Sequence, residues 1–88
     1  MTFEVMVEIS LRPGIADPQG ATIERSLPAL GFEGVRGVRV GKSIRFLLDA
    51  PDGTTASARV QEMCDRFLAN PVIEDCSVTV AAAEAEAV

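Results

Sequence analysis

Apolar and polar residues alternate at the start of the chain. Every odd position from Phe3 to Leu11 is apolar, and the positions between them are polar at Glu4, Glu8 and Ser10. A period of two is typical of a strand with one buried face. Met6 interrupts the polar set, so we expect the second face of this strand to be partly covered as well.

Helical spacing replaces the alternation after a Pro/Gly loop. Asp17-Pro18 is typical of a helix start, because the carboxylate accepts backbone N–H groups and proline needs no donor at the first helical position. Gly31 suits the left-handed conformation that closes a helix, whereas Pro28 lacks an N–H, so we expect the regular helix to tighten or end early. The apolar residues between these signals share one stripe: Ile23, Leu27 and Leu30.

Two β-rich runs, Val35–Val40 and Ile44–Leu48, predict a hairpin around Gly41-Lys42-Ser43. A three-residue connection pairs Val40 with Ile44 and keeps the apolar residues of both runs on one face. A two-residue loop would break that register.

A second amphipathic helix follows the turn at residues 49–54. Thr54 or Thr55 is suited to cap it, and Asn70-Pro71 stops it. Its apolar stripe consists of Ala56, Val60, Met63, Cys64, Phe67 and Leu68. Alternation then returns in a last strand, at Cys76, Val78 and Val80.

The predicted element order is β-α-β-β-α-β. In an α+β protein this order indicates a ferredoxin-like antiparallel sheet with both helices on one face. The 88 residues are too few for two cores, so residues 1–80 are predicted to form one domain and residues 81–88 a flexible Ala/Glu tail. Because the core is small, we expect a dimer or a higher oligomer. Met6 and Leu47 lie outside the main apolar registers of their strands and support this expectation.

Charge and cysteine usage narrow the class of protein. The net charge is −5, from 13 acidic and 8 basic residues without a basic cluster, which argues against a nucleic-acid partner. No apolar run approaches the ~20 residues that span a bilayer, and no signal peptide is recognisable, so a cytoplasmic location is expected. With no histidine and no CxxC motif, Cys64 and Cys76 are expected to be reduced core residues and not a disulfide or metal site.

Catalytic groups are hard to find in this sequence. Acid–base and nucleophilic catalysis usually need a histidine, or another nucleophile with a positioned base. Cys64 lies on an apolar helical stripe and is expected to be inert, and the adjacent Glu74 and Asp75 point to opposite faces of a strand. The glycines at 34, 37 and 41 lie on the predicted hairpin, where backbone geometry explains them better than a phosphate loop.

The remaining candidates are polar residues on loops and strand ends, suited to a complex interface: Asp17, Gln19, Arg39, Lys42, Asn70, Glu74 and Asp75. Capping explains Asp17 and Asn70 well. For Arg39 and Lys42, docking and ordinary solvation remain equally open. From the residues alone, the prediction is a small interaction domain.

Three stretches resemble, in order, the signature stretches of the PurS family. They are Asp17-Pro18-Gln19-Gly20, Val38-Arg39-Val40-Gly41-Lys42 and Leu68-Ala69-Asn70-Pro71-Val72-Ile73-Glu74-Asp75. Met63-Cys64 and the chain length agree as well, and the resemblance spans Phe3 to Val80. Three features depart from the family: Cys76 stands where a tyrosine is common, Pro28 is unusual, and the tail has no counterpart.

The resemblance implies a role in phosphoribosylformylglycinamidine synthase, in de novo purine (IMP) biosynthesis. In that family a PurQ-like glutaminase releases ammonia and a PurL-like synthetase activates formylglycinamide ribonucleotide with ATP, while a PurS dimer joins them. The resemblance implies no catalytic residue and no bound cofactor in this chain, although the complex would use ATP, magnesium and glutamine.

Two other classes of function compete with this reading. A dimeric regulatory module that binds a metabolite is compatible with a ferredoxin-like fold, because such folds host many functions. A stand-alone enzyme is disfavoured, since no nucleophile is paired with a base.

Overall fold

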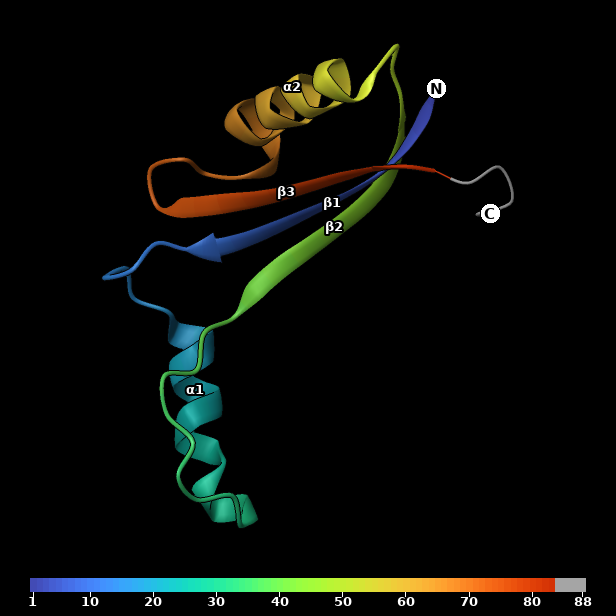
Figure 1. Ribbon diagram of the computed structural model, residues 1–88. Helices are drawn as coiled ribbons and strands as arrows, with labels where there is room; N and C mark the ends of the chain where they lie inside the picture. The colour runs from blue at the N-terminus through green and yellow to red at the C-terminus, as the bar shows by residue number, and fades with distance from the viewer. Residues whose placement is uncertain (84–88) are drawn as a thin grey trace.

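The computed structural model describes residues 1–83 as a three-stranded antiparallel sheet. One helix packs on a face of the sheet, and a second helix projects from one end (Figure 1). The elements are β1 (Thr2–Leu11), α1 (Pro18–Ser26), a 3₁₀ turn (Pro28–Leu30), β2 (Gly41–Asp49), α2 (Gly53–Met63), a π-helical turn (Cys64–Leu68) and β3 (Glu74–Ala82). The prediction of an α+β protein with an antiparallel sheet is confirmed. None of the helices within residues 1–83 is long and apolar enough to cross a membrane.

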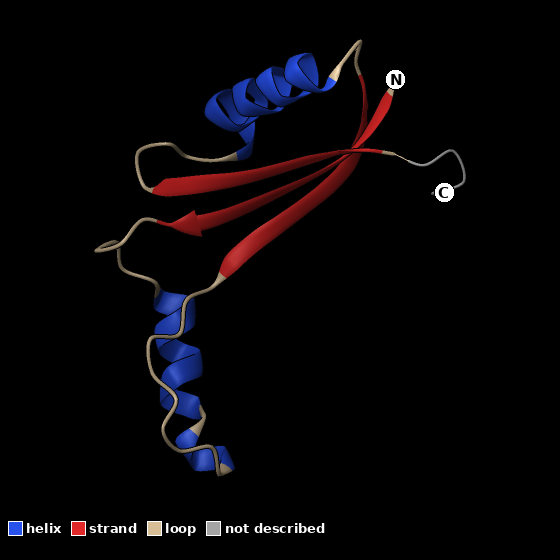
Figure 2. Ribbon diagram, in the orientation of Figure 1, coloured by secondary structure: helices blue, strands red, loops and turns tan. Residues whose placement is uncertain are grey.

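The core lies between the sheet and α2. Strand β1 is central, and the sheet order is β2-β1-β3 (Figure 2). The odd residues of β1 from Phe3 to Ile9 are buried as predicted, whereas Leu11 at the end of the strand is half-buried. Val7 lies opposite Ile44 on β2 and Val78 on β3. Val60 of α2 and Cys64 just after it pack on the buried residues of β1. The buried face of the strand is thus covered by the apolar stripe of the helix.

The other face of the sheet is open within residues 1–83. Glu4 and Glu8 are exposed there, Met6 is half-buried, and Leu47 is 52% exposed. Helix α1 does not cover either face, because it points away from the end of the sheet (Figure 1). The expectation that both helices pack on one face is therefore wrong for α1.

The predicted hairpin is also wrong, because the run Val35–Val40 forms no strand. It lies along α1, and β2 begins at Gly41 and, among the residues that the structure describes, pairs only with β1. Gly34 and Gly37 have φ values of 86° and 72°, which interrupt an extended strand. The sheet therefore has three strands, in the order β-α-β-α-β. We call residues 17–40, which contain α1 and this returning segment, the arm.

The helix ends follow most of the local signals. The regular part of α1 ends at Ser26, a 3₁₀ turn begins at Pro28, and Gly31 closes it with φ 94°, as predicted. The predicted threonine cap of α2 is wrong: the carboxylate of Asp52 accepts the N–H of Thr55 at 2.7 Å. An aspartate placed before the first turn satisfies that donor, and it leaves the threonines inside the helix.

The C-terminal boundary differs slightly from the predicted one. Ala81 and Ala82 belong to β3, where they pair with Glu4 and Phe3 of β1. The prediction of a flexible tail otherwise concerns residues 84–88, which lie outside the described residues.

Candidate functional site

The three signature stretches meet at one end of the sheet, which we call the junction. Antiparallel pairing brings the C-terminal end of β1 beside the N-terminal ends of β2 and β3, so segments far apart in sequence converge there (Figure 1). The junction consists of Leu11–Gly20, Val38–Lys42 and Asn70–Asp75.

Asp17 holds the base of the arm together. Its Oδ1 accepts the N–H of Gly20 at 2.9 Å, and its Oδ2 accepts the N–H of Val40 at 2.8 Å. These two hydrogen bonds, that from Gly20 first, lower the pKa of Asp17 below its ordinary value. Their contribution to stability is present above the pKa of the unfolded chain and is lost as pH falls through the lowered pKa.

Arg39 has a structural role that the sequence did not reveal. Its guanidinium donates to the carbonyl oxygens of Ile15 at 3.1 Å, Arg12 at 3.3 Å and Leu11 at 3.4 Å. The planar fork of arginine suits this set of acceptors, which lie at the end of β1 and in the loop after it. Arg39 therefore fastens the arm to the sheet.

The loop before β3 is held by hydrogen bonds from its own side chains. Asn70 Oδ1 accepts the N–H of Val72 at 3.1 Å, and Glu74 Oε1 accepts the N–H of Asn70 at 2.7 Å. Arg12, which was not predicted, forms an ion pair with Asp75 at 3.3 Å and donates to the carbonyl of Pro71 at 2.6 Å. Its position after β1, opposite an acidic pair at the start of β3, is the signal that could have identified it.

A shallow hollow of about 430 Å³ opens at the junction. Four predicted residues line it together: Asp17, Gln19, Lys42 and Glu74. Arg39, Asn70 and Asp75 do not line it. Within residues 1–83, the side chains of Gln19 and Lys42 form neither a hydrogen bond nor an ion pair, so the junction offers an amide and an ammonium group to a partner.

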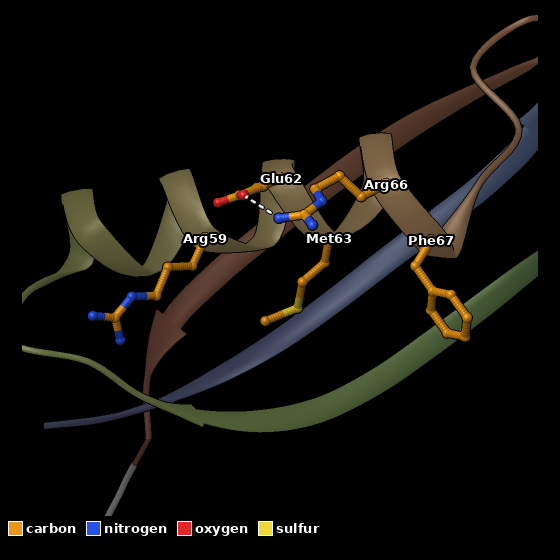
Figure 3. A pocket seen from close by; sticks show the side chains of 5 residues that line it. All are labelled: Arg59, Glu62, Met63, Arg66 and Phe67. Carbon is orange, nitrogen blue, oxygen red and sulfur yellow. Dashed lines mark hydrogen bonds and ion pairs between the residues drawn. The ribbon is translucent and has the colours of Figure 1, made fainter.

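A second surface lies along the side of α2 that faces β2 (Figure 3). A groove of about 580 Å³ is lined by Arg59, Glu62, Met63, Arg66 and Phe67, with Arg66 and Glu62 paired at 2.8 Å (Figure 3). Phe67 was predicted in the core, but it is 86% exposed. The π-helical turn widens the helix after Cys64, so Leu68 packs inward and Phe67 points outward.

The thiol of Cys64 is a poor nucleophile. Its side chain is 1% exposed, and burial, with a further contribution from Cys76, raises its pKa to about 11. The buried Cys64 is therefore protonated at neutral pH and poorly placed to act as a nucleophile. Residues 1–83 also contain no cluster of three carboxylate or thiol groups that could hold a metal ion.

We expect a thiol reagent to label Cys64 slowly in the folded chain, and Cys64→Ala to lower stability by roughly 1 kcal/mol through lost packing. Above pH 9 the unfolded thiol ionises while the folded thiol stays protonated. Stability should therefore fall as pH rises from 9 towards about 11, and less so in the alanine variant. Denaturation across this range measures the effect, and rapid labelling of Cys64 at neutral pH would contradict its burial.

Known proteins of one family match this chain along nearly its whole length. The family described as PurS: Phosphoribosylformylglycinamidine (FGAM) synthase matches residues 4–82. The PurS subunit of phosphoribosylformylglycinamidine synthase from Synechocystis sp. is 41% identical over 83 residues, covering 94% of this chain and 83% of that protein.

Solved structures agree with the family match. Methanocaldococcus jannaschii PurS superposes with a TM-score of 0.83 at 36% identity, covering 93% of this chain and 99% of that chain. A chain of PurLQS from Thermotoga maritima gives a TM-score of 0.84 at 32% identity, covering 91% and 98%. With the three signature stretches gathered at one junction, these matches show that the chain belongs to the PurS family of phosphoribosylformylglycinamidine synthase subunits.

Proposed function

We propose that this chain is the non-catalytic assembly subunit that joins a PurQ-like glutaminase to a PurL-like synthetase. The observation that carries this proposal is its full-length likeness to a chain of PurLQS from Thermotoga maritima. The chemistry of the chain supports it, because the sequence has no histidine, Cys64 is buried with a raised pKa, and residues 1–83 hold no cluster of metal-ligating groups.

The complex would convert formylglycinamide ribonucleotide, glutamine, ATP and water into formylglycinamidine ribonucleotide, glutamate, ADP and phosphate. A subunit without reactive groups raises the rate by holding two active sites so that ammonia passes between them and does not escape into water. ATP, magnesium and glutamine would accordingly be bound by the other subunits, in the cytoplasm.

The junction is the proposed contact with a partner subunit. Gln19 and Lys42 present polar groups that the described part of the chain does not use, and Glu74 adds negative charge beside them. Mixed charges at a shallow surface favour orientation and register of a partner. Asp17, Arg39 and Asn70 would act by holding this surface in shape.

Capture from a native cell extract tests the assembly role. The tagged chain should retain a glutaminase and an ATP-dependent synthetase, and a charge-reversed Lys42→Glu chain should retain less of both. A chain that captures neither, yet gains heat stability from a single metabolite, would instead support a regulatory module.

A further inference from the structure

The loop between the π-helical turn and β3 carries an exposed apolar side chain. Val72 is 78% exposed, although it lies inside the third signature stretch. The loop lies at the same end of the sheet as the base of the arm (Figure 1). One exposed valine is ordinary on a protein surface. What sets Val72 apart is the backbone that carries it, because this backbone is tied both within the loop and to the neighbouring strand.

Hydrogen bonds within the loop fix its shape. Asn70 Oδ1 accepts the N–H of Val72 at 3.1 Å. The carbonyl oxygen of Asn70 accepts the N–H groups of Ile73 at 3.1 Å and Glu74 at 2.8 Å. Glu74 Oε1 in turn accepts the N–H of Asn70 at 2.7 Å. Pro71 restricts the backbone further, because its ring fixes φ.

Arg12 ties this loop to the end of β1. Its guanidinium donates to the carbonyl oxygen of Pro71 at 2.6 Å and pairs with Asp75 at 3.3 Å. Its backbone N–H donates to the carbonyl oxygen of Ile73 at 2.8 Å. The side chains of Arg12 and Asp75 are 48% and 59% exposed, so their ion pair adds little stability. Its effect is geometric, because the planar fork of arginine holds a carbonyl and a carboxylate on one side chain.

A rigid apolar side chain on a fixed loop is suited to recognition. Valine branches at Cβ and has few rotamers, and the ordered loop has little conformational freedom left to lose on binding. Apolar anchors contribute most where polar contacts around them exclude water. The junction hollow provides such contacts, because Glu74 belongs to both the loop and the hollow, where Gln19 and Lys42 lie beside it.

We propose that Val72, held in position by Arg12, enters an apolar pocket on one of the two catalytic subunits. This inference rests on the proposed function and deepens it, because it adds an apolar anchor to a contact that is otherwise polar. A second copy of this chain is a poorer occupant. A two-fold contact centred on this loop would bring the two copies of Glu74 together, and like charges repel.

Calorimetric titration with the isolated glutaminase and synthetase subunits tests the anchor. Val72→Thr keeps the branched shape, but it places a hydroxyl without a partner in the apolar pocket. It should lower the affinity for one subunit about tenfold and leave thermal unfolding unchanged. Val35→Thr makes the same change at an exposed valine of the arm and is the control, with affinity as in the wild-type chain.

The two ways in which this titration can fail have different meanings. If Val72→Thr binds as tightly as the wild-type chain, or if Val35→Thr loses as much affinity, the anchor is overturned and the assembly role stands. If the wild-type chain binds neither subunit, the assembly role and the anchor are both overturned.

A double-mutant cycle tests Arg12 as a positioning residue. Arg12→Ala removes the contacts with Pro71 and Asp75, so amide hydrogen exchange at Val72 should accelerate and affinity should fall about fivefold. Because Arg12 acts through Val72, the same change in the Val72→Thr chain should cost less than about twofold. Losses that multiply fully in the double variant would overturn the positioning role.

Discussion

A single methyl group at position 20 is expected to destabilise the arm, although glycine-to-alanine replacement within a helix ordinarily stabilises a protein. Gly20 is buried at the start of α1, and a Cβ there would overlap the carbonyl oxygen of Val38 and approach Asp17 Oδ2 to 2.8 Å. Neither group can withdraw easily, because Asp17 and Val38 belong to the bonds that hold the arm. The expected cost is about 1–3 kcal/mol.

Gly53→Ala is the matched control, because Gly53 also lies in the first turn of a helix. A Cβ there would meet only the Phe3 ring at 3.8 Å, an ordinary contact, so this variant should gain about 0.4–1 kcal/mol. Amide hydrogen exchange at Val38 and Val40 measures the arm directly and should accelerate only in Gly20→Ala. Equal stability of the two variants would show that the arm packs differently around Gly20.

Charge reversal at Lys42 should weaken binding of a partner subunit without unfolding this chain. Lys42 lines the junction hollow and makes no intramolecular ion pair within residues 1–83, so Lys42→Glu removes only a group available to the partner. We expect about a tenfold loss of affinity, larger at low salt than at high salt, since exposed charges are screened.

Arg39→Glu provides the contrast at the neighbouring signature position. Its guanidinium donates to three backbone carbonyls, so reversal should lower the stability of the arm as well as association. Titration of each variant with the isolated partner subunits, beside thermal unfolding, separates the two effects. Unchanged affinity for Lys42→Glu at low salt would show that Lys42 is an ordinary solvated charge.

The strands β1 and β3 could be predicted because their burial follows a period of two within a single segment. Pro28 and Gly31 likewise act locally, and the end of α1 follows them. The predicted hairpin failed because its donors are used elsewhere: Asp17 and Glu24 accept the N–H groups of Val40 and Val38 from 23 and 14 residues away. No local sequence pattern predicts acceptors so far away along the chain.

The structure assigns contacts to several of the candidate site residues that the sequence did not predict. The seven polar residues lie at or near the junction, but Arg39 and Asp17 use their polar groups in hydrogen bonds to the backbone that hold the arm. The contacts of Arg12 with Pro71 and Asp75 were not predicted. The outward position of Phe67 could not be derived from helical spacing either, because a π-helical turn shifts the stripe by one residue. The first error arises from long-range hydrogen bonds and an ion pair, and the second from a local change in helix geometry.

The most direct test of the assembly role is the rate of formylglycinamidine ribonucleotide formation by the two catalytic subunits, with and without this chain. With glutamine as the nitrogen source, omission of the chain should reduce synthesis to near background. With added ammonium, the rate should change far less, because free ammonia needs no aligned path between active sites. The account also predicts that the chain alone hydrolyses neither glutamine nor ATP. Undiminished glutamine-driven synthesis in its absence would contradict the account.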